Sequence, residues 1–300
     1  MSETLAFIVD MLVHATPLMI AGLAVAIAFR AGIWNIGADG QFIAGATAAA
    51  WIGVSVPAEI GWLALVLALI AGAVAGGIWA ALAAWLRSRF GVLEVISTIM
   101  LNFVATYGAS YLVRGPLQEP THVYPQTSSI VHGAHMPILL AGTRLHWGFV
   151  IALVLAMAAW WFMKYSATGF RIGASGINPF AARSAGLIDV SRVTTAAFIV
   201  SGAIAGIAGA VEVSGVTFAL YENISPGYGY TAIAVALLAG LNPLGVIGTG
   251  LLFGALETAA GTMQRNIGIP STTASVIEAV VILAVIAISQ LRANRVTAGA

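Results

Sequence analysis

Residues 29–51 read FRAGIWNIGADGQFIAGATAAAW and lie between two long apolar runs. This stretch is too apolar for an ordinary solvent loop and too polar for a lipid-facing helix. Asn35, Asp39 and Gln41 stand among four glycines that break a helix. Non-helical backbone at membrane depth is tolerated only where protein or a cavity covers it. The stretch therefore predicts a broken helix, with these three side chains lining an internal path of the kind transporters use.

A second interpretation of the same stretch stays open at this point. Turns between helices are common, and a tight cytoplasmic turn would place Arg30 near Asp39. In that case the two side chains form an ion pair at the membrane surface, and the stretch has no part in a path.

The composition fixes the class of protein around this stretch. Of the 300 residues, 60% are hydrophobic and 8% are charged, against roughly 25% charged in soluble domains. The apolar runs are about 20 residues long, which is the length of a membrane-crossing helix rather than of a barrel strand. The sequence therefore predicts an all-α, polytopic integral membrane helix bundle.

The hydropathy pattern predicts about nine spans within a single transmembrane domain over residues 1–300. Two of them, 36–56 and 229–241, are weak and are predicted to be broken or re-entrant rather than full crossings. The nine predicted spans are 5–29, 36–56, 60–86, 91–113, 147–163, 193–217, 229–241, 243–263 and 273–291.

The basic residues of the short loops set the predicted orientation. Positive charge favours the cytoplasmic side. The loop 164–192 holds four basic residues, the turn 87–90 holds two, and the tail after 291 holds two more. These segments fall on one side when the spans alternate, so the C-terminus is predicted to be cytoplasmic. The loop 114–146 is then outside, and the chain crosses the membrane several times.

A polar stripe follows the helix predicted over 91–113. Glu94, Thr98 and Asn102 recur at i, i+4 and i+8, so they share one face of an otherwise apolar helix. Polar groups inside a membrane usually face the bundle interior or a water-filled path. Two interpretations are equally open here: the stripe lines the path, or it forms interhelical hydrogen bonds.

Pairs of small residues recur at Gly72/Gly76, Gly202/Gly206 and Gly250/Gly254. This spacing lets helix backbones approach closely, and we expect it to serve packing inside one bundle rather than a dimer face.

Several chemistries find no support in the sequence. It has no cysteine and no G-x-x-x-x-G-K-[ST] motif for nucleotide binding. His132 and His135 have H-x-x-H spacing, but a zinc site needs more ligands held rigidly. No nucleophile–base arrangement is recognisable. We predict no metal, no cofactor, no catalytic residue and no nucleic-acid partner, and an intramembrane enzyme or a passive channel is the alternative class.

The loop 164–192 contains a second informative stretch. Asn178 and Pro179 predict a helix start, because Asn caps helices and Pro suits the first turn. Phe180 and Arg183 follow, and Gly186 predicts its end. A short amphipathic helix on the membrane face suits docking into a groove of a partner protein. The residues alone equally allow a helix that lies on lipid headgroups.

Four motifs together resemble a known family. They are ATPLMIAGLAVAIAFRAGIWNIGADGQFIAG (15–45), EVISTIMLNFVA (94–105), GINPFAARSAGLIDVSR (176–192) and AIAVALLAGLNPLGVIGTGLLFGAL (232–256). They are similar to permease subunits of bacterial ABC importers of the ribose and branched-chain amino-acid permease group, which implies a multi-pass protein of a bacterial inner membrane. Within that group the chain looks most like nucleoside-type permeases. Members usually carry one more N-terminal helix, so the sequence departs from the pattern there.

The resemblance implies a function and a set of partners. It implies an ATP-driven importer subunit, not itself an enzyme, with a separate cytoplasmic ATP-binding subunit. It also implies an extracytoplasmic solute-binding protein and a second, related permease in a heterodimer within the lipid bilayer. The helix at 176–186 is then the coupling helix, with Asn178, Pro179, Phe180, Arg183 and Gly186 at the ATPase.

The solute follows less directly from the resemblance. A nucleoside is expected, and a simple sugar of the ribose type is the alternative. Nucleosides need aromatic faces for the base, and Trp34, Phe103, Tyr107 and Tyr111 are candidates by residue type.

Overall fold

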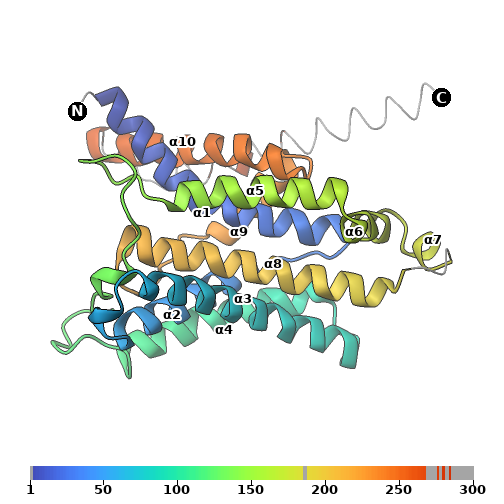
Figure 1. Ribbon diagram of the computed structural model, residues 1–300, viewed down its shortest axis with the longest axis horizontal. Coiled ribbons are helices and arrows are strands. Elements are labelled where there is room, and N and C mark those ends of the chain that lie inside the picture. Colours follow the sequence, from blue (N-terminus) through green and yellow to red (C-terminus); the bar gives the residue numbers. More distant parts are fainter. Residues whose placement is uncertain (1–2, 185–187, 268–275, 277–278, 281–283, 285–300) are drawn as a thin grey trace.

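The computed structural model describes residues 3–184 and 188–267, together with positions 276, 279, 280 and 284 (Figure 1). This part of the chain is helical and contains no strand, only two isolated bridges. The helices are α1 (Glu3–Arg30), α2 (Ala38–Ser55), α3 (Leu63–Phe90), α4 (Glu94–Arg114), α5 (Gly148–Tyr165), α6 (Ala167–Ile177), α7 (Pro179–Ser184), α8 (Val190–Glu212), α9 (Tyr228–Leu238) and α10 (Pro243–Ile267). Two short 3-10 helices are η1 (Ala58–Ile60) and η2 (His132–Ala134), and η3 (Val213–Thr217) is a short π-helix.

The polytopic bundle predicted from hydropathy is confirmed. Six of the described helices are long and apolar enough to cross a membrane: α1, α3, α4, α5, α8 with η3, and α10. The two weak spans correspond to α2, with 18 residues, and α9, with only 11. The ninth predicted span, 273–291, lies almost wholly outside the described residues.

The bundle has two ends of different character (Figure 1). We call one the basic end, because it carries Arg30, Arg87, Arg89, Lys164, Arg171, Arg183 and Arg192 at the ends of α1, α3 and α5, on α6 and α7, and at the start of α8. The other is the loop end, where residues 115–147 connect α4 to α5 and the chain enters α1. These ends lie at the right and the left of Figure 1, respectively.

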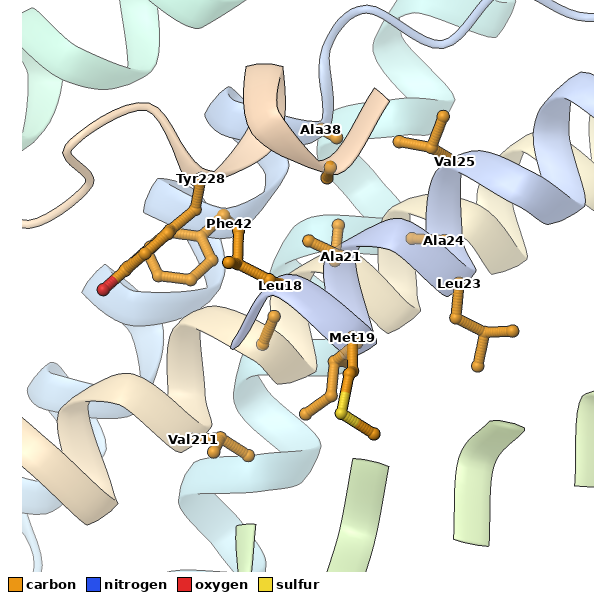
Figure 2. Close-up of a cluster of buried hydrophobic side chains, with 14 of the residues drawn as sticks. Leu18, Met19, Ala21, Leu23, Ala24, Val25, Ala38, Phe42, Val211 and Tyr228 are labelled. Carbon is orange, nitrogen blue, oxygen red and sulfur yellow. The ribbon is translucent and has the colours of Figure 1, made fainter. Parts of the chain in front are cut away.

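Helix α1 forms the centre of the bundle. Its residues from Ala15 to Ala28 are buried, and it packs against α8, α9 and α10. Figure 2 shows Leu18 and Met19 of α1 among the neighbouring helices, with Phe42 of α2 beside Tyr228 of α9 at a ring-centroid distance of 5.5 Å. Helices α3, α4 and α5 instead leave apolar side chains exposed. A central helix covered by protein and outer helices with apolar exposed faces are expected of a bundle in lipid.

Glycines bring α2, α3 and α8 into backbone contact. A Cβ on Gly72 would lie 2.6 Å from the Cβ of Ala210 and 2.9 Å from the carbonyl oxygen of Gly206. Gly76 meets Gly202 and Gly206 in the same way. The small-residue pairs thus pack within one bundle, as the sequence predicted, because only glycine leaves room for backbones this close.

Candidate functional site

The connection between α1 and α2 enters the bundle instead of forming a surface turn. Asn35 is fully buried, and its Nδ2 donates to Ser201 Oγ at 2.9 Å. Ser201 lies about three turns into α8, roughly 16 Å from the first residue of that helix. Its hydroxyl in turn donates to the carbonyl oxygen of Ala24 at 2.6 Å. Residues 31–37 are therefore non-helical and carry Asn35 into the bundle interior, so the predicted break between the two helices is present.

The amides of Asn35 and Gln41 bind each other. Asn35 Nδ2 donates to Gln41 Oε1 at 2.9 Å, and Gln41 Nε2 donates to Asn35 Oδ1 at 3.1 Å. The same Oδ1 accepts from the backbone N–H of Gly37 at 3.0 Å. These bonds fix the first turn of α2, where backbone N–H groups have no partner within the helix.

Asp39 joins the starts of two helices. Its carboxylate Oδ1 accepts from Ser225 Oγ at 2.6 Å and from the backbone N–H of Gly229 at 3.0 Å. Asp39 lies in the first turn of α2, and Gly229 lies in the first turn of α9. One carboxylate thus faces the partial positive charge of two helix N-termini inside the bundle. The alternative ion pair between Arg30 and Asp39 is wrong, because this carboxylate is bound here.

Asn102 ties the same place to α4. Its Oδ1 accepts from the backbone N–H of Gly40 at 2.8 Å, and its Nδ2 donates to the carbonyl oxygen of Ile36 at 2.9 Å. Nδ2 also donates to the hydroxyl of Tyr230 at 3.1 Å. We call this set the interior junction: Asn35, Asp39, Gln41, Asn102, Ser201, Ser225, Gly229 and Tyr230.

The polar stripe of α4 divides between two environments. Asn102 bonds to neighbouring segments, which is the interhelical interpretation. Thr98 is also buried, but its hydroxyl donates to the Glu94 carbonyl oxygen of its own helix at 2.7 Å. The Glu94 carboxylate lies at the basic end, 3.5 Å from Nε of Arg87. The structure therefore places Asn35, Asp39, Gln41 and Asn102 together and leaves Glu94 apart.

Sequence reasoning missed the α9 half of this junction. Ser225, Gly229 and Tyr230 belong to the stretch SPGYGY, and Ser201 carries no motif. The signal in the sequence was Pro226–Gly227, which breaks a weak span just as the glycines near Asn35 do. Two short, interrupted apolar segments in one membrane chain are a general pointer to such a junction.

The helix predicted after Asn178 is present as α7. Asn178 Oδ1 accepts from the backbone N–H groups of Phe180 and Ala181 at 3.1 and 3.0 Å, so the predicted cap is confirmed. Phe180 is 80% exposed and Ile177 is 88% exposed. Arg183 is exposed too, while Gly186 lies outside the described residues. Two large apolar side chains and an arginine thus face away from the bundle at its basic end.

The α6–α7 segment touches the α1–α2 connection directly. A Cβ on Gly176 would meet the backbone of Arg30, and it would lie 3.0 Å from the nitrogen of Gly32. Gly32 has a φ of +80°, where a larger side chain is strained. The last turn of α6 therefore packs against the non-helical segment that leads to Asn35.

The histidines at the loop end contact other protein groups and are not arranged as metal ligands within the described residues. Among the residues that the structure describes, no three His, Cys, Asp or Glu side chains gather as ligands would. The ring of His135 stacks on Phe218 at 4.3 Å. Burial lowers the pKa of His146 to about 4, with the charge of Arg144 acting in the same direction. His146 is therefore neutral at physiological pH.

A bundle of spanning helices with two short inner helices, joined near their N-termini by polar bonds, is typical of membrane permeases. Comparison with known families gives the particular one. Residues 7–286 match the family described as "Branched-chain amino acid transport system / permease component", and the chain belongs to it.

Individual relatives agree with this assignment. The chain is 37% identical over 272 residues to the Guanosine ABC transporter permease protein NupP of Bacillus subtilis, covering 89% of this chain and 77% of that protein. It is 36% identical over 285 residues to the Glucose ABC transporter permease protein TsgB13 of Haloferax volcanii, covering 91% and 74%. It is 33% identical over 276 residues to the Nucleoside ABC transporter permease protein NupB of Lactococcus lactis, covering 89% and 75%.

Proposed function

We propose that this chain is the permease subunit of an ATP-driven ABC importer for nucleosides. The observation that carries the proposal is the family match over residues 7–286, together with two similar proteins named for guanosine and for nucleosides. The chain supplies the solute path and the mechanical link, and it performs no chemistry. The sequence has no P-loop motif, so a separate chain hydrolyses the ATP.

The test of the solute is uptake by cells that carry the complete transporter. Guanosine uptake should depend on this chain, and unlabelled nucleosides should compete for it. A second candidate solute has its own support, because a glucose permease protein is 36% identical. Uptake of glucose or ribose that nucleosides do not inhibit would favour the sugar and end the nucleoside proposal.

In this proposal, the interior junction fixes the shape of the wall of the solute path. Asn35, Asp39, Gln41, Thr98 and Asn102 are buried, so in this proposal they hold the wall from behind. Tyr230, which Asn102 holds, is 45% exposed and reaches the surface. Glu94 would mark the basic end of the same wall.

Exposed aromatic side chains on α4 support a solute with a base. Phe103, Tyr107 and Tyr111 are each at least half exposed and recur at i, i+4 and i+8 on one face of the helix. Tyrosine is unusual on a purely lipid-facing surface away from the interfaces. Trp34 is also exposed and packs against Phe29 at 4.9 Å.

Helix α7 is proposed as the coupling helix, with Phe180 as an anchor in the ATP-binding subunit. An aromatic anchor at an interface typically costs about 2 kcal/mol or more on truncation. Phe180→Ala with Arg183→Glu should release the ATPase during purification and stop uptake. Arg89→Glu with Phe90→Ala is the matched control, because this pair also lies exposed at the basic end. A double variant at α7 that keeps its ATPase and the parental uptake rate would mean that α7 lies on headgroups.

The same proposal places the basic end in the cytoplasm of a bacterial cell, with the C-terminus on that side. Single cysteines test it, since the sequence has none of its own. Ser184 and Ser129 are both exposed, at the basic end and the loop end respectively. An impermeant thiol reagent on whole cells should label Ser129→Cys and spare Ser184→Cys. Ser175 is unsuitable for this test, because it is only 2% exposed.

The partners in this proposal are an ATP-binding subunit, an extracytoplasmic solute-binding protein and a second, non-identical permease. The form of residues 29–41 supports the heterodimer, since it resembles one of two permeases that work together. If the purified chain alone moved nucleosides in liposomes as fast as the full complex does, the passive-channel interpretation would replace this one.

A further inference from the structure

A cationic cavity lies at the basic end, between α1, α5 and the turn that joins α9 to α10. It has a volume of about 450 Å³. Arg30 lines it from the end of α1, and Trp160, Met163 and Lys164 line it from the end of α5. The turn between α9 and α10, residues 240–242, closes the third side. The cavity therefore lies where three membrane segments reach the same surface.

The two cations of this cavity lack a carboxylate partner within the described ranges. The acidic side chains at the basic end are already matched: Glu94 with Arg87 at 3.5 Å and Asp189 with Arg192 at 2.9 Å. Nζ of Lys164 lies 4.9 Å from the ring centroid of Trp160, which orients the ammonium without neutralising it. No described carboxylate neutralises these two cations, so the cavity is suited to an anionic ligand.

The surface that leads to the cavity is apolar. Val154, Met157, Trp161 and Lys164 recur at i, i+3, i+7 and i+10, so they share one face of α5. The first three are 54%, 57% and 61% exposed. Trp160 and Tyr165 frame the end of this face, as aromatic residues do at a membrane interface. A molecule that fits the whole surface has an anionic group at the end of an apolar body.

We propose that this cavity binds the phosphate of an anionic phospholipid, with Arg30 and Lys164 on the headgroup and the acyl chains along α5. Basic pockets between membrane helices recognise lipid headgroups in this way. A soluble phosphate compound carries the same anionic group, but it would leave the exposed face of α5 unused. The proposal does not depend on which solute the chain transports.

The test is binding of phosphatidylglycerol or phosphatidylcholine to the intact chain, measured by native mass spectrometry. Phosphatidylglycerol should bind roughly tenfold more tightly than phosphatidylcholine, since each basic residue near a membrane surface adds measurably to the attraction. Arg30→Gln with Lys164→Gln should abolish this preference. Arg89→Gln with Arg171→Gln removes the same charge from the same end outside the cavity and should keep it.

Further variants protect the test against misfolding. Arg30→Lys with Lys164→Arg keeps both charges and should keep the preference. Lys164→Gln alone changes an exposed side chain and should lose part of it. Equal loss in the cavity and control variants would overturn the proposal, because it would show general surface attraction. Displacement of the lipid by millimolar glycerol phosphate would also overturn it and identify a soluble phosphate as the ligand.

Discussion

At the interior junction, buried polar groups form hydrogen bonds within the chain. At the basic end, by contrast, polar and apolar side chains are exposed and free to contact other molecules. Asp39 and Asn102 each make bonds to two or more segments. Phe180 and Arg183, by contrast, face away from the bundle. The difference shows that the polar groups of the junction are satisfied within this chain, whereas those of the basic end can bind water or a partner. An unpaired polar group in the membrane interior costs several kcal/mol, whereas water or a partner satisfies one at the surface.

The largest expected effect comes from Gly229, where α9 meets α2. A Cβ there would lie 2.5 Å from the Cβ of Asp39. Gly229→Ala should therefore destabilise the protein by more than about 3 kcal/mol, because the two helix ends must separate. The readout is thermal unfolding in detergent and the yield in membranes. Gly248→Ala in α10 is the matched control, since nothing lies within 4 Å of its added Cβ. Equal stability of the two variants would show that the junction adapts.

A smaller effect separates two positions on one helix face. Asn102→Ala removes bonds to Gly40, Ile36 and Tyr230 and leaves buried partners unsatisfied, at a cost of about 2–3 kcal/mol. Thr98→Val should cost less than about 1 kcal/mol, because its hydroxyl bonds only within α4. Thermal unfolding of both variants measures the difference. Similar losses at the two positions would mean that the stripe acts as one unit and that Asn102 is not special.

The basic end should show the reverse pattern, with no loss of stability. Phe180→Ala removes a side chain that is 80% exposed, so the unfolding free energy should change by less than about 0.5 kcal/mol. Phe42→Ala, at a fully buried position, should cost about 3–5 kcal/mol. Uptake should fall in both, but only the Phe180 variant should remain stably folded. A destabilised Phe180 variant would contradict the contrast between the two regions.

The smallest effect concerns an ion pair at the loop end. Arg114 donates to both carboxylate oxygens of Glu222, at 3.0 and 2.7 Å, and this lowers the pKa of Glu222. The stability that the pair adds is present above the ordinary carboxyl pKa of about 4.3 and is lost as the pH falls through the lower folded value.

Glu222→Gln should therefore reduce the melting temperature at pH 7 by no more than about 3 °C, because the pair is exposed. The difference from the parent should vanish in acid. Glu59→Gln, an exposed acid at the loop end that makes no ion pair in the described structure, serves as the control. A difference that persists unchanged in acid would show that charge is not its cause.

Sequence patterns were sufficient for the described spanning helices and for one half of the junction, but they did not predict α6. Apolar runs gave the spans, and the glycines around Asn35 indicated a broken helix, because helix breaking is a local property of the chain. Asn178 predicted the cap of α7 for the same reason. The partner of Asp39 could not be predicted, because Ser225 and Gly229 are distant in sequence and meet it only after α2 and α9 fold together. The cavity at Arg30 and Lys164 could not be predicted either, because its three sides come from segments that are distant in sequence.

The contact of Gly176 with Arg30 and Gly32 removes a degree of freedom from the molecule. The end of α6 cannot approach the bundle further, because backbone already touches backbone there. If α7 is the coupling helix, as proposed, a push on α7 toward the bundle would reach residues 31–37 through this contact. The end of α6 and the connection between α1 and α2 would then move together. A side chain at position 176 would lengthen that linkage without changing any residue at either end of it.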